Sequence, residues 1–356
     1  MSEKKERIIL DVAYQPQVRT GTDTRRIMLD VMLALLPAVA VAVWQFGLYP
    51  LAVIAVSMGS AALFEWGYRK LMKKSNTLGD LSALVTGMLL ALTLPPTAPL
   101  WLPVIGTLFA IVVVKQLYGG IGKNFLNPAL AARAVLLASY ALLMGQYALP
   151  RALAGVELVS SATPLSYLYD TGAMPAYYSY KALLLGTVPG SIGELSALAL
   201  LLGGLYLIVR KVISWRIPVS FVGTVAVLTL LFGREGFSHA EWMLYNLLSG
   251  GLLLGAIFMA TDYATSPVTL NGQLLYGAGC GVLTVLIRTF GGFPEGVSYA
   301  ILIMNLCAWS IDKAFRRHPF GVSRHDLAAK RAADKAARAA EKAAKAAEQA
   351  ERRAMR

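Results

Sequence analysis

The chain has 356 residues, of which 56% are hydrophobic and only 15% are charged. Soluble domains carry about 25% charged residues, so this composition excludes an ordinary soluble protein. The net charge of +13 does not indicate nucleic-acid binding, because the basic residues alternate with long apolar runs and form no continuous basic stripe. The composition therefore predicts an all-α polytopic membrane protein.

The apolar runs, in chain order, predict ten transmembrane helices. A span needs about 20 helical residues to cross a hydrocarbon core about 30 Å thick. The predicted spans are 27–46, 48–68, 80–95, 99–118, 126–146, 193–212, 216–233, 241–260, 271–290 and 297–315. They divide the chain into a polar arm (1–26), five helices (27–146), a polar loop (147–192), five more helices (193–322) and a tail (323–356).

The arm and the tail are not predicted to enter the membrane. Residues 1–26 lack the short apolar core and small-residue cleavage site of a signal peptide, so we expect the first helix to be retained. The tail is rich in Ala, Lys and Glu, which are strong helix formers, but it has no large apolar residues for a coiled-coil seam. We expect a solvated, partly helical segment.

Lys and Arg fall almost entirely on one side of the predicted spans. With the N-terminus placed in the cytoplasm, 29 of the 33 basic residues lie on the cytoplasmic side. This asymmetry is typical of the positive-inside rule. We therefore expect both termini in the cytoplasm and the loop 147–192 on the outer face. The acids Asp30 and Glu65 are expected at the membrane interfaces.

An internal repeat relates the two sets of five helices. The sequence Thr-Leu-Pro-Pro-Thr at 93–97 recurs 172 residues later as Thr-Ser-Pro-Val-Thr at 265–269. At the same offset, Tyr-Gly-Gly at 118–120 aligns with Phe-Gly-Gly at 290–292. With five spans in each half, the second half enters from the opposite side, which predicts two inverted repeats. A span interrupted near Pro precedes the repeated helix in each half, and such breaks require protein or a polar cavity to satisfy the freed backbone groups.

The histidines and cysteines indicate no metal site and no catalytic centre. The three histidines have no metal-ligand spacing, and Cys280 and Cys307 lie inside apolar runs, where buried small side chains are expected. Two cysteines do not suffice for a four-cysteine cluster.

Several motifs in order make the chain similar to a known family. The stretch 119–129 (Gly-Gly-Ile-Gly-Lys-Asn-Phe-Leu-Asn-Pro-Ala), the stretch 259–262 (Met-Ala-Thr-Asp), the chain length and the ten spans resemble the D subunit of Rnf complexes. That family is homologous to the B subunit of the sodium-pumping NADH:quinone reductase. The resemblance covers roughly residues 5–322 and leaves out the tail. The inverted five-plus-five arrangement of the predicted helices resembles that of urea and ammonium channels.

The resemblance implies a covalent flavin in the outer loop. In the family, a flavin transferase attaches FMN through a phosphoester to the Thr of a Ser-Gly-Ala-Thr motif, which here reads Ser160-Ser161-Ala162-Thr163. Ser161 replaces the usual Gly, and Glu157 stands where an Asp is usual. Small neighbours favour access to the Thr163 hydroxyl, and Pro164 disfavours helix at Thr163. We therefore expect an accessible acceptor in an extended segment.

The resemblance also implies a second, non-covalent flavin, riboflavin. Asn127 and Asp262 occupy the Asn-Pro and Ala-Thr-Asp positions that such a site would use. The alternative interpretation is structural, because Asn127-Pro128 is a typical turn and Asp262 fits a helix end. An acid near a membrane cavity is costly unless it is paired or functional.

The predicted function is that of a membrane electron-transfer subunit in an ion-translocating ferredoxin:NAD oxidoreductase. Other subunits are expected to supply the remaining chemistry: membrane subunits of the A and E types, a flavin-bearing G type, and iron-sulfur B and C types. The chain alone is not expected to be active. Two alternatives stay open at this point: a channel or solute transporter of the same fold without flavin, and the B subunit of the quinone reductase. The expected location is the cytoplasmic (inner) membrane of a bacterium or archaeon.

Overall fold

The structure is a computed structural model that describes residues 23–153, 163–171, 178–234, 236–291 and 296–315, together with Ala333 and Ala336. The described residues form helices and turns and contain no strand, which confirms the all-α prediction. Residues 1–312 form one compact unit, and 313–356 form another. Most of the N-terminal arm and of the tail, and the loop residues Ser160, Ser161 and Ala162, lie outside the described residues.

The helices follow the predicted spans closely, with short additional turns between them. Those of the first half are α1 (Thr24–Phe46), α2 (Tyr49–Leu71), η1 (Leu78–Asp80), α3 (Ser82–Leu92), α4 (Trp101–Leu108), η2 (Phe109–Gln116), α5 (Pro128–Ser139), α6 (Ala141–Met144) and η3 (Arg151–Leu153). The loop carries α7 (Pro164–Thr171) and α8 (Tyr180–Leu185). Those of the second half are α9 (Ala197–Val209), α10 (Arg216–Leu231), α11 (His239–Leu248), α12 (Leu252–Leu254), η4 (Gly255–Met259), α13 (Leu270–Phe290) and α14 (Val297–Ala314). Here η2 and η4 are π-helical, whereas η1 and η3 are 3₁₀ turns.

The lengths of these helices fit a multi-pass membrane protein. Among the described residues, α1, α2 and α13 are long and apolar enough to cross a membrane. A fourth candidate consists of α11 followed by α12 and η4, with a bend of 61° between the two parts. Shorter apolar helices occupy the third to seventh predicted spans, and α14 occupies the tenth. The number of spans therefore stays a prediction.

Non-helical segments precede α4 and α13, as the Pro-containing repeat predicts. The first, between α3 and α4, leaves carbonyls that accept hydrogen bonds from another segment: Gly193 N donates to Leu92 O (2.7 Å), and Ile192 N donates to Leu94 O (3.0 Å). At the second, the Asp312 carboxylate accepts from the Val268 and Thr269 amides at 3.0–3.1 Å. At both breaks, other parts of the protein thus supply partners for freed backbone groups.

A third break, which the repeat does not predict, divides the eighth span. Gly250 and Gly251 have φ of +69° and +57° between α11 and α12. Glycine has no Cβ to oppose this left-handed conformation, so the pair ends α11 and redirects the chain. The eighth span is therefore two short helices rather than the continuous helix predicted over 241–260.

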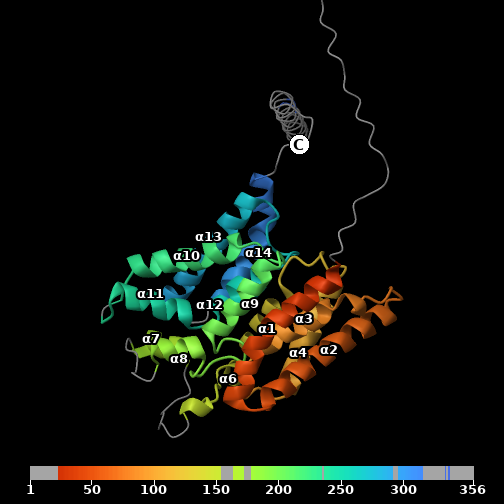
Figure 1. Cartoon of the computed structure of the whole chain (residues 1–356). Helices are drawn as coiled ribbons and strands as arrows, with labels where there is room; N and C mark the ends of the chain where they lie inside the picture. The colour runs from red at the N-terminus through yellow and green to blue at the C-terminus, as the bar shows by residue number, and fades with distance from the viewer. Residues whose placement is uncertain are drawn as a thin grey trace, which may run out of the picture. The chain divides into compact units, whose positions relative to one another are not determined.

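The two halves meet where α1 lies beside α9 (Figure 1). Gly203 approaches the α1 backbone so closely that a Cβ there would lie 2.1 Å from Ala34 O. Close backbone approach at small residues is a common way for membrane helices to pack. The same seam holds an ion pair, Arg210 Nη2 to Asp30 Oδ2 at 3.2 Å, and Tyr206 Oη donates to Asp30 at 2.9 Å. The Asp30 carboxylate is buried among these partners. Its expected position at a membrane interface stays a prediction.

Candidate functional site

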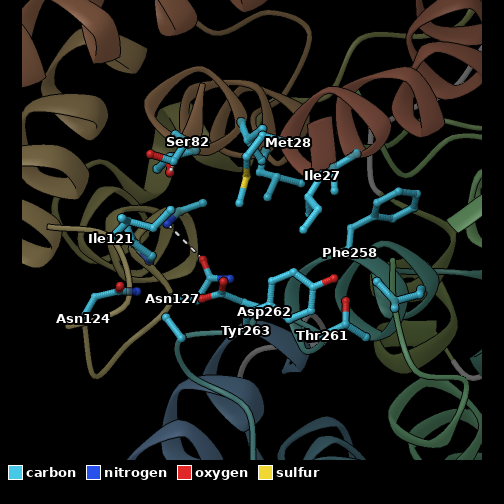
Figure 2. Close-up of a pocket in the computed structure, with 18 of the residues that line it drawn as sticks. Ile27, Met28, Ser82, Ile121, Asn124, Asn127, Phe258, Thr261, Asp262 and Tyr263 are labelled. Atoms are coloured by element: carbon cyan, nitrogen blue, oxygen red, sulfur yellow. Dashed lines mark hydrogen bonds between the residues drawn. The ribbon is translucent and has the colours of Figure 1, made fainter. Parts of the chain in front are cut away.

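A cavity lies between α1, α3, the start of α5 and the turn after η4. Its volume is about 100 Å³, and most of its wall is apolar. Figure 2 shows Ile27, Met28 and Ser82 on one side of it, opposite Thr261, Asp262 and Tyr263. The polar side chains in the wall come from both halves of the chain: Ser82, Thr86, Lys115, Asn124, Asn127, Thr261, Asp262 and Tyr263. The structure thus brings together Asn127 and Asp262, the two positions predicted for a non-covalent flavin.

A larger hollow adjoins this cavity. Its volume is about 740 Å³, and it shares Ile27, Met28 and Asp262 with the cavity wall. Phe125, from the loop before α5, and Trp309, from α14, contribute aromatic surface to it. Pockets for ligands of cofactor size enclose roughly 300–1,000 Å³, so the hollow, but not the inner cavity alone, has that capacity.

Asn127 has a structural role in the cavity wall. Its Oδ1 accepts hydrogen bonds from the Ala129 and Leu130 amides, so it caps α5, and Pro128 occupies the first helical position. Its Nδ2 donates to Met259 O at 3.1 Å, which ties the start of α5 to the end of η4. An N-cap of this kind contributes about 1 kcal/mol. The structural interpretation of Asn127 is therefore confirmed, and its place in the wall leaves a ligand role open.

Asp262 is half-buried and lies in the turn between η4 and α13. Burial raises the pKa of this carboxyl. Hydrogen bonds from Thr265 and from the Ala264 amide, and the positive charge of Lys115, oppose the rise in pKa. The carboxyl thus protonates more readily than an exposed aspartate does.

Lys115 in the cavity wall belongs to a buried ion pair that the sequence did not predict. Lys115 Nζ lies 2.7 Å from Glu65 Oε2 and 2.6 Å from Ser82 Oγ, and the two charged side chains are 4% and 1% exposed. Glu65 Oε1 accepts from Thr77 Oγ1 at 2.6 Å. Glu65 is buried within the protein, and its expected position at a membrane interface stays a prediction. The pair was hard to predict from the sequence, because Lys115 stands near the end of a predicted span, where a basic residue ordinarily flanks the membrane.

Thr163, the predicted flavin acceptor, is not among the residues that line the cavity. It precedes α7, and its Oγ1 accepts from the Ser166 amide (3.2 Å) and pairs with Ser166 Oγ (2.9 Å). The helix begins at Pro164, in agreement with the expectation that Pro164 keeps Thr163 out of the helix. The expected exposure differs: Thr163 is only 3% exposed, because the first turn of α7 packs its side chains inward, with Leu165 fully buried.

The helix α7 rests on the break in the eighth span. Arg288 of α13 donates to the carbonyls that end α11: Asn246 (2.7 Å), Gly250 (2.8 Å) and Ser249 (3.4 Å). Tyr169 Oη of α7 donates to Asn246 Oδ1 at 3.0 Å. Burial raises the pKa of Tyr169, and the charges of Arg288 and Arg234 oppose the rise. The charge asymmetry predicts Arg288 on the outer side of the membrane. Its side chain is only 2% exposed, so it lies inside the protein rather than on its surface.

Aromatic side chains surround α7 on the loop and on α11. Tyr180 stacks on Tyr245 with ring centroids 4.9 Å apart, and Tyr169 lies 5.3 Å from Trp242. Arg234 lies over the rings of Tyr169 and Trp242 and donates to Tyr169 O at 3.1 Å. Burial, with the neighbouring Tyr245 and Glu241, raises the pKa of Tyr180 to about 12. Aromatic groups with one apolar side and one polar end are typical of membrane interfaces.

The two cysteines differ in their surroundings. Cys280 is buried within α13, as expected, but Cys307 is exposed on α14. The prediction that both are buried was therefore wrong for Cys307, because its helix position faces away from the bundle.

Comparison with known proteins assigns the chain to a family. Residues 11–321 match the profile of the NQR2, RnfD, RnfE family. The chain belongs to this family. A relative from Acetobacterium woodii, the D subunit of a Na⁺-translocating ferredoxin:NAD⁺ oxidoreductase complex, is 47% identical over 90% of this chain and 98% of the relative.

Two further relatives have the same designation. The D subunit of a proton-translocating ferredoxin:NAD⁺ oxidoreductase complex from Clostridium ljungdahlii is 41% identical over 89% of this chain and 97% of the relative. The D subunit of an ion-translocating oxidoreductase complex from Escherichia coli is 36% identical over 88% of this chain and 99% of the relative. These matches confirm the predicted resemblance to the Rnf D subunit, a component of an oxidoreductase assembly.

Proposed function

We propose that this chain is the electron-transferring membrane component of the D type in an ion-translocating ferredoxin:NAD oxidoreductase complex and carries FMN on Thr163. The observation that supports this most strongly is the match to relatives named as D subunits over nearly their whole length. The flavin supplies the redox chemistry, and the protein supplies its position and its potential.

We propose ten membrane spans in two inverted repeats of five. The packing supports this: α2 packs on α3 and α4, as α10 packs on α11 and α13, and the first helices of the two halves meet at the α1–α9 seam. The charge asymmetry supports cytoplasmic termini in the inner membrane, with the loop 147–192 outside.

The surroundings of Thr163 suit a phosphoester. Its hydroxyl stands at the start of α7, where the Ser166 amide and Ser166 Oγ already bond to its oxygen. Helix N-termini favour negatively charged groups, so the same donors would hold phosphate oxygens. Because Thr163 is buried, we propose that the flavin transferase acts before α7 packs on the break between α11 and α12.

The cavity suits a second, non-covalent flavin with its ring in the larger hollow and one edge in the inner cavity. The wall offers apolar surface, with Asn127, Asp262 and Lys115 as polar groups, and such a mixture is typical of cofactor sites. We propose riboflavin for this site, as the resemblance to the family implies.

The remaining steps of the reaction belong to partner subunits. The sequence has only two cysteines, so clusters that exchange electrons with ferredoxin must lie in other chains. We propose membrane partners of the A and E types, a flavin-bearing G type, and iron-sulfur B and C types. Relatives are named for sodium and for proton translocation, so both ions remain candidates.

The test is in-gel flavin fluorescence of the denatured full-length chain after co-expression with a flavin transferase. We expect fluorescence in the wild type and none in Thr163→Ala. Ser179→Ala is a matched control, because Ser179 caps the neighbouring helix α8 from the same loop. This control should keep the fluorescence.

A wild-type chain without fluorescence beside an active transferase would refute the covalent FMN. The channel alternative, which needs no flavin, would then be preferred. A quinone-reduction assay of the intact complex separates the ferredoxin:NAD assignment from the quinone reductase, since the family includes both.

A further inference from the structure

Lys115 is a buried cation in the wall of the cavity, with its counter-charge on the side away from the ligand space. Lys115 and Ser82 line the cavity, whereas Glu65 does not. The Lys115 ammonium donates to Glu65 and to Ser82. An ammonium has three hydrogens to donate, so these two bonds leave one for a ligand.

The carboxylate of Glu65 is fixed independently of Lys115. Glu65 Oε1 accepts from Thr77 Oγ1, and Ser82 Oγ donates to Asp80 Oδ1 at 2.5 Å. Thr77 and Asp80, from the segment before α3, thus hold Glu65 and Ser82 in place, and neither Thr77 nor Asp80 lines the cavity. A ligand in the cavity therefore meets Lys115 before Glu65, whereas the Asp262 carboxyl faces the same space from the other half of the chain.

A contribution to folding stability does not by itself explain why such a pair is buried here. Burying two charges costs desolvation energy that their attraction only partly offsets, and well-packed apolar residues often serve as well. Inside a protein, however, a charge acts strongly on its neighbours because screening is weak. A cation beside a redox cofactor therefore favours whichever oxidation state carries more negative charge.

We propose that Lys115 sets the reduction potential of the flavin in the cavity, and that Glu65 limits how much of the lysine charge the flavin experiences. This inference rests on the proposed non-covalent flavin. A bound flavin would accept an electron from the ferredoxin side of the complex and would then carry one more negative charge. Lys115 keeps its proton throughout and contributes only a hydrogen bond and its positive charge.

The pair predicts potential shifts of opposite sign. Lys115→Met removes the cation, so the flavin potential should fall. Glu65→Gln leaves the cation unbalanced, so the potential should rise. Each change should alter the equilibrium constant for reduction by about tenfold, which is about 59 mV for one electron.

The measurement is a spectroelectrochemical titration of the purified full-length chain in a Thr163→Ala background, where only the non-covalent flavin remains. Lys115→Arg keeps the positive charge, so its flavin potential should stay close to that of the protein with Lys115. Arg210→Met is a matched control, because it breaks another ion pair, with Asp30, that does not line the cavity. It should leave the potential unchanged.

The outcomes separate the two proposals. Flavin absent from the Thr163→Ala protein would refute the second flavin, and this role of Lys115 with it. Flavin present, with potentials that do not shift or that shift in the same direction in both variants, would refute only the role of Lys115. If Lys115→Met does not fold, the double variant Lys115→Met/Glu65→Gln avoids an unpaired buried charge and should still show the lower potential.

Discussion

The cavity and the region beneath α7 each contain a buried cation, and the two cations have different partners. Lys115 bonds to the carboxylate of Glu65 and lies beside an open space. Arg288 donates to main-chain carbonyls at the end of α11 and lies beneath a packed helix. Carbonyl groups hold the backbone in one shape, whereas a cation beside a cavity responds to the charge of a ligand. The partners of a buried charge, rather than its burial, therefore indicate its role.

The strongest test of this difference is Arg288→Met. The change leaves three carbonyls at the α11 break without their donor, and breaking a buried charged network costs about 3–5 kcal/mol. We expect a large fall in the melting temperature of the detergent-solubilised protein. The double variant Lys115→Met/Glu65→Gln should change it little. Equal effects of the two variants would contradict the distinction.

Gly250→Ala should loosen α7 without removing a charge. Gly250 has φ of +69°, and an added Cβ would lie 2.3 Å from Leu165 Cδ2. The left-handed conformation alone costs roughly 1–2 kcal/mol for a residue with a Cβ. Because α7 would be displaced, we expect faster flavin attachment to Thr163 in a time course of in-gel fluorescence. Gly223→Ala is the control, since a Cβ there meets nothing within 4 Å. Slower attachment in Gly250→Ala would show that the transferase needs α7 in its packed position.

Asn127→Ala should weaken the cavity wall moderately. It removes the cap of α5, worth about 1 kcal/mol, and also the bond to Met259 O. Asn127→Asp keeps the cap but cannot donate to that carbonyl. We expect Asn127→Ala to lower both the melting temperature and the retained non-covalent flavin, and Asn127→Asp to lower mainly the flavin. If Asn127→Ala keeps all of its flavin, Asn127 is a structural cap only.

The smallest expected effect is a change in pH dependence at Asp262. The folded-state pKa lies above the ordinary value of 3.8, so the folded protein binds this proton more tightly than the unfolded chain does. The resulting stability is present below about pH 3.9 and is lost as pH rises through the folded pKa. Asp262→Asn should remove this loss, so its melting temperature relative to wild type should rise with pH across that window. A constant difference from pH 4 to pH 8 would contradict the raised pKa.

The sequence predicted features that depend on local composition. The apolar runs placed the helices, and Pro128 and Pro164 marked the starts of α5 and α7. Asn127 and Asp262, named from motifs far apart in sequence, do line one cavity.

The sequence did not predict features that depend on contacts between distant segments. Glu65 and Lys115 are 50 residues apart, and each alone resembles a residue at a membrane interface. Gly250 and Gly251 are a local signal for the break that the repeat did not use, whereas the contacts of the break with Arg288 and α7 come from segments distant in sequence. Burial of Thr163 follows from that same packing, so an accessible loop was the natural but incorrect expectation.

The close contact of Gly203 with Ala34 restricts how the two halves can move. A side chain at position 203 would overlap the α1 backbone, so α9 cannot slide along α1 in the direction that brings Leu202 into that gap. Transporters of inverted-repeat architecture move by rocking one bundle against the other. In this protein, any such rocking would have to pivot at the α1–α9 seam, with the larger displacements at the far edges of each half.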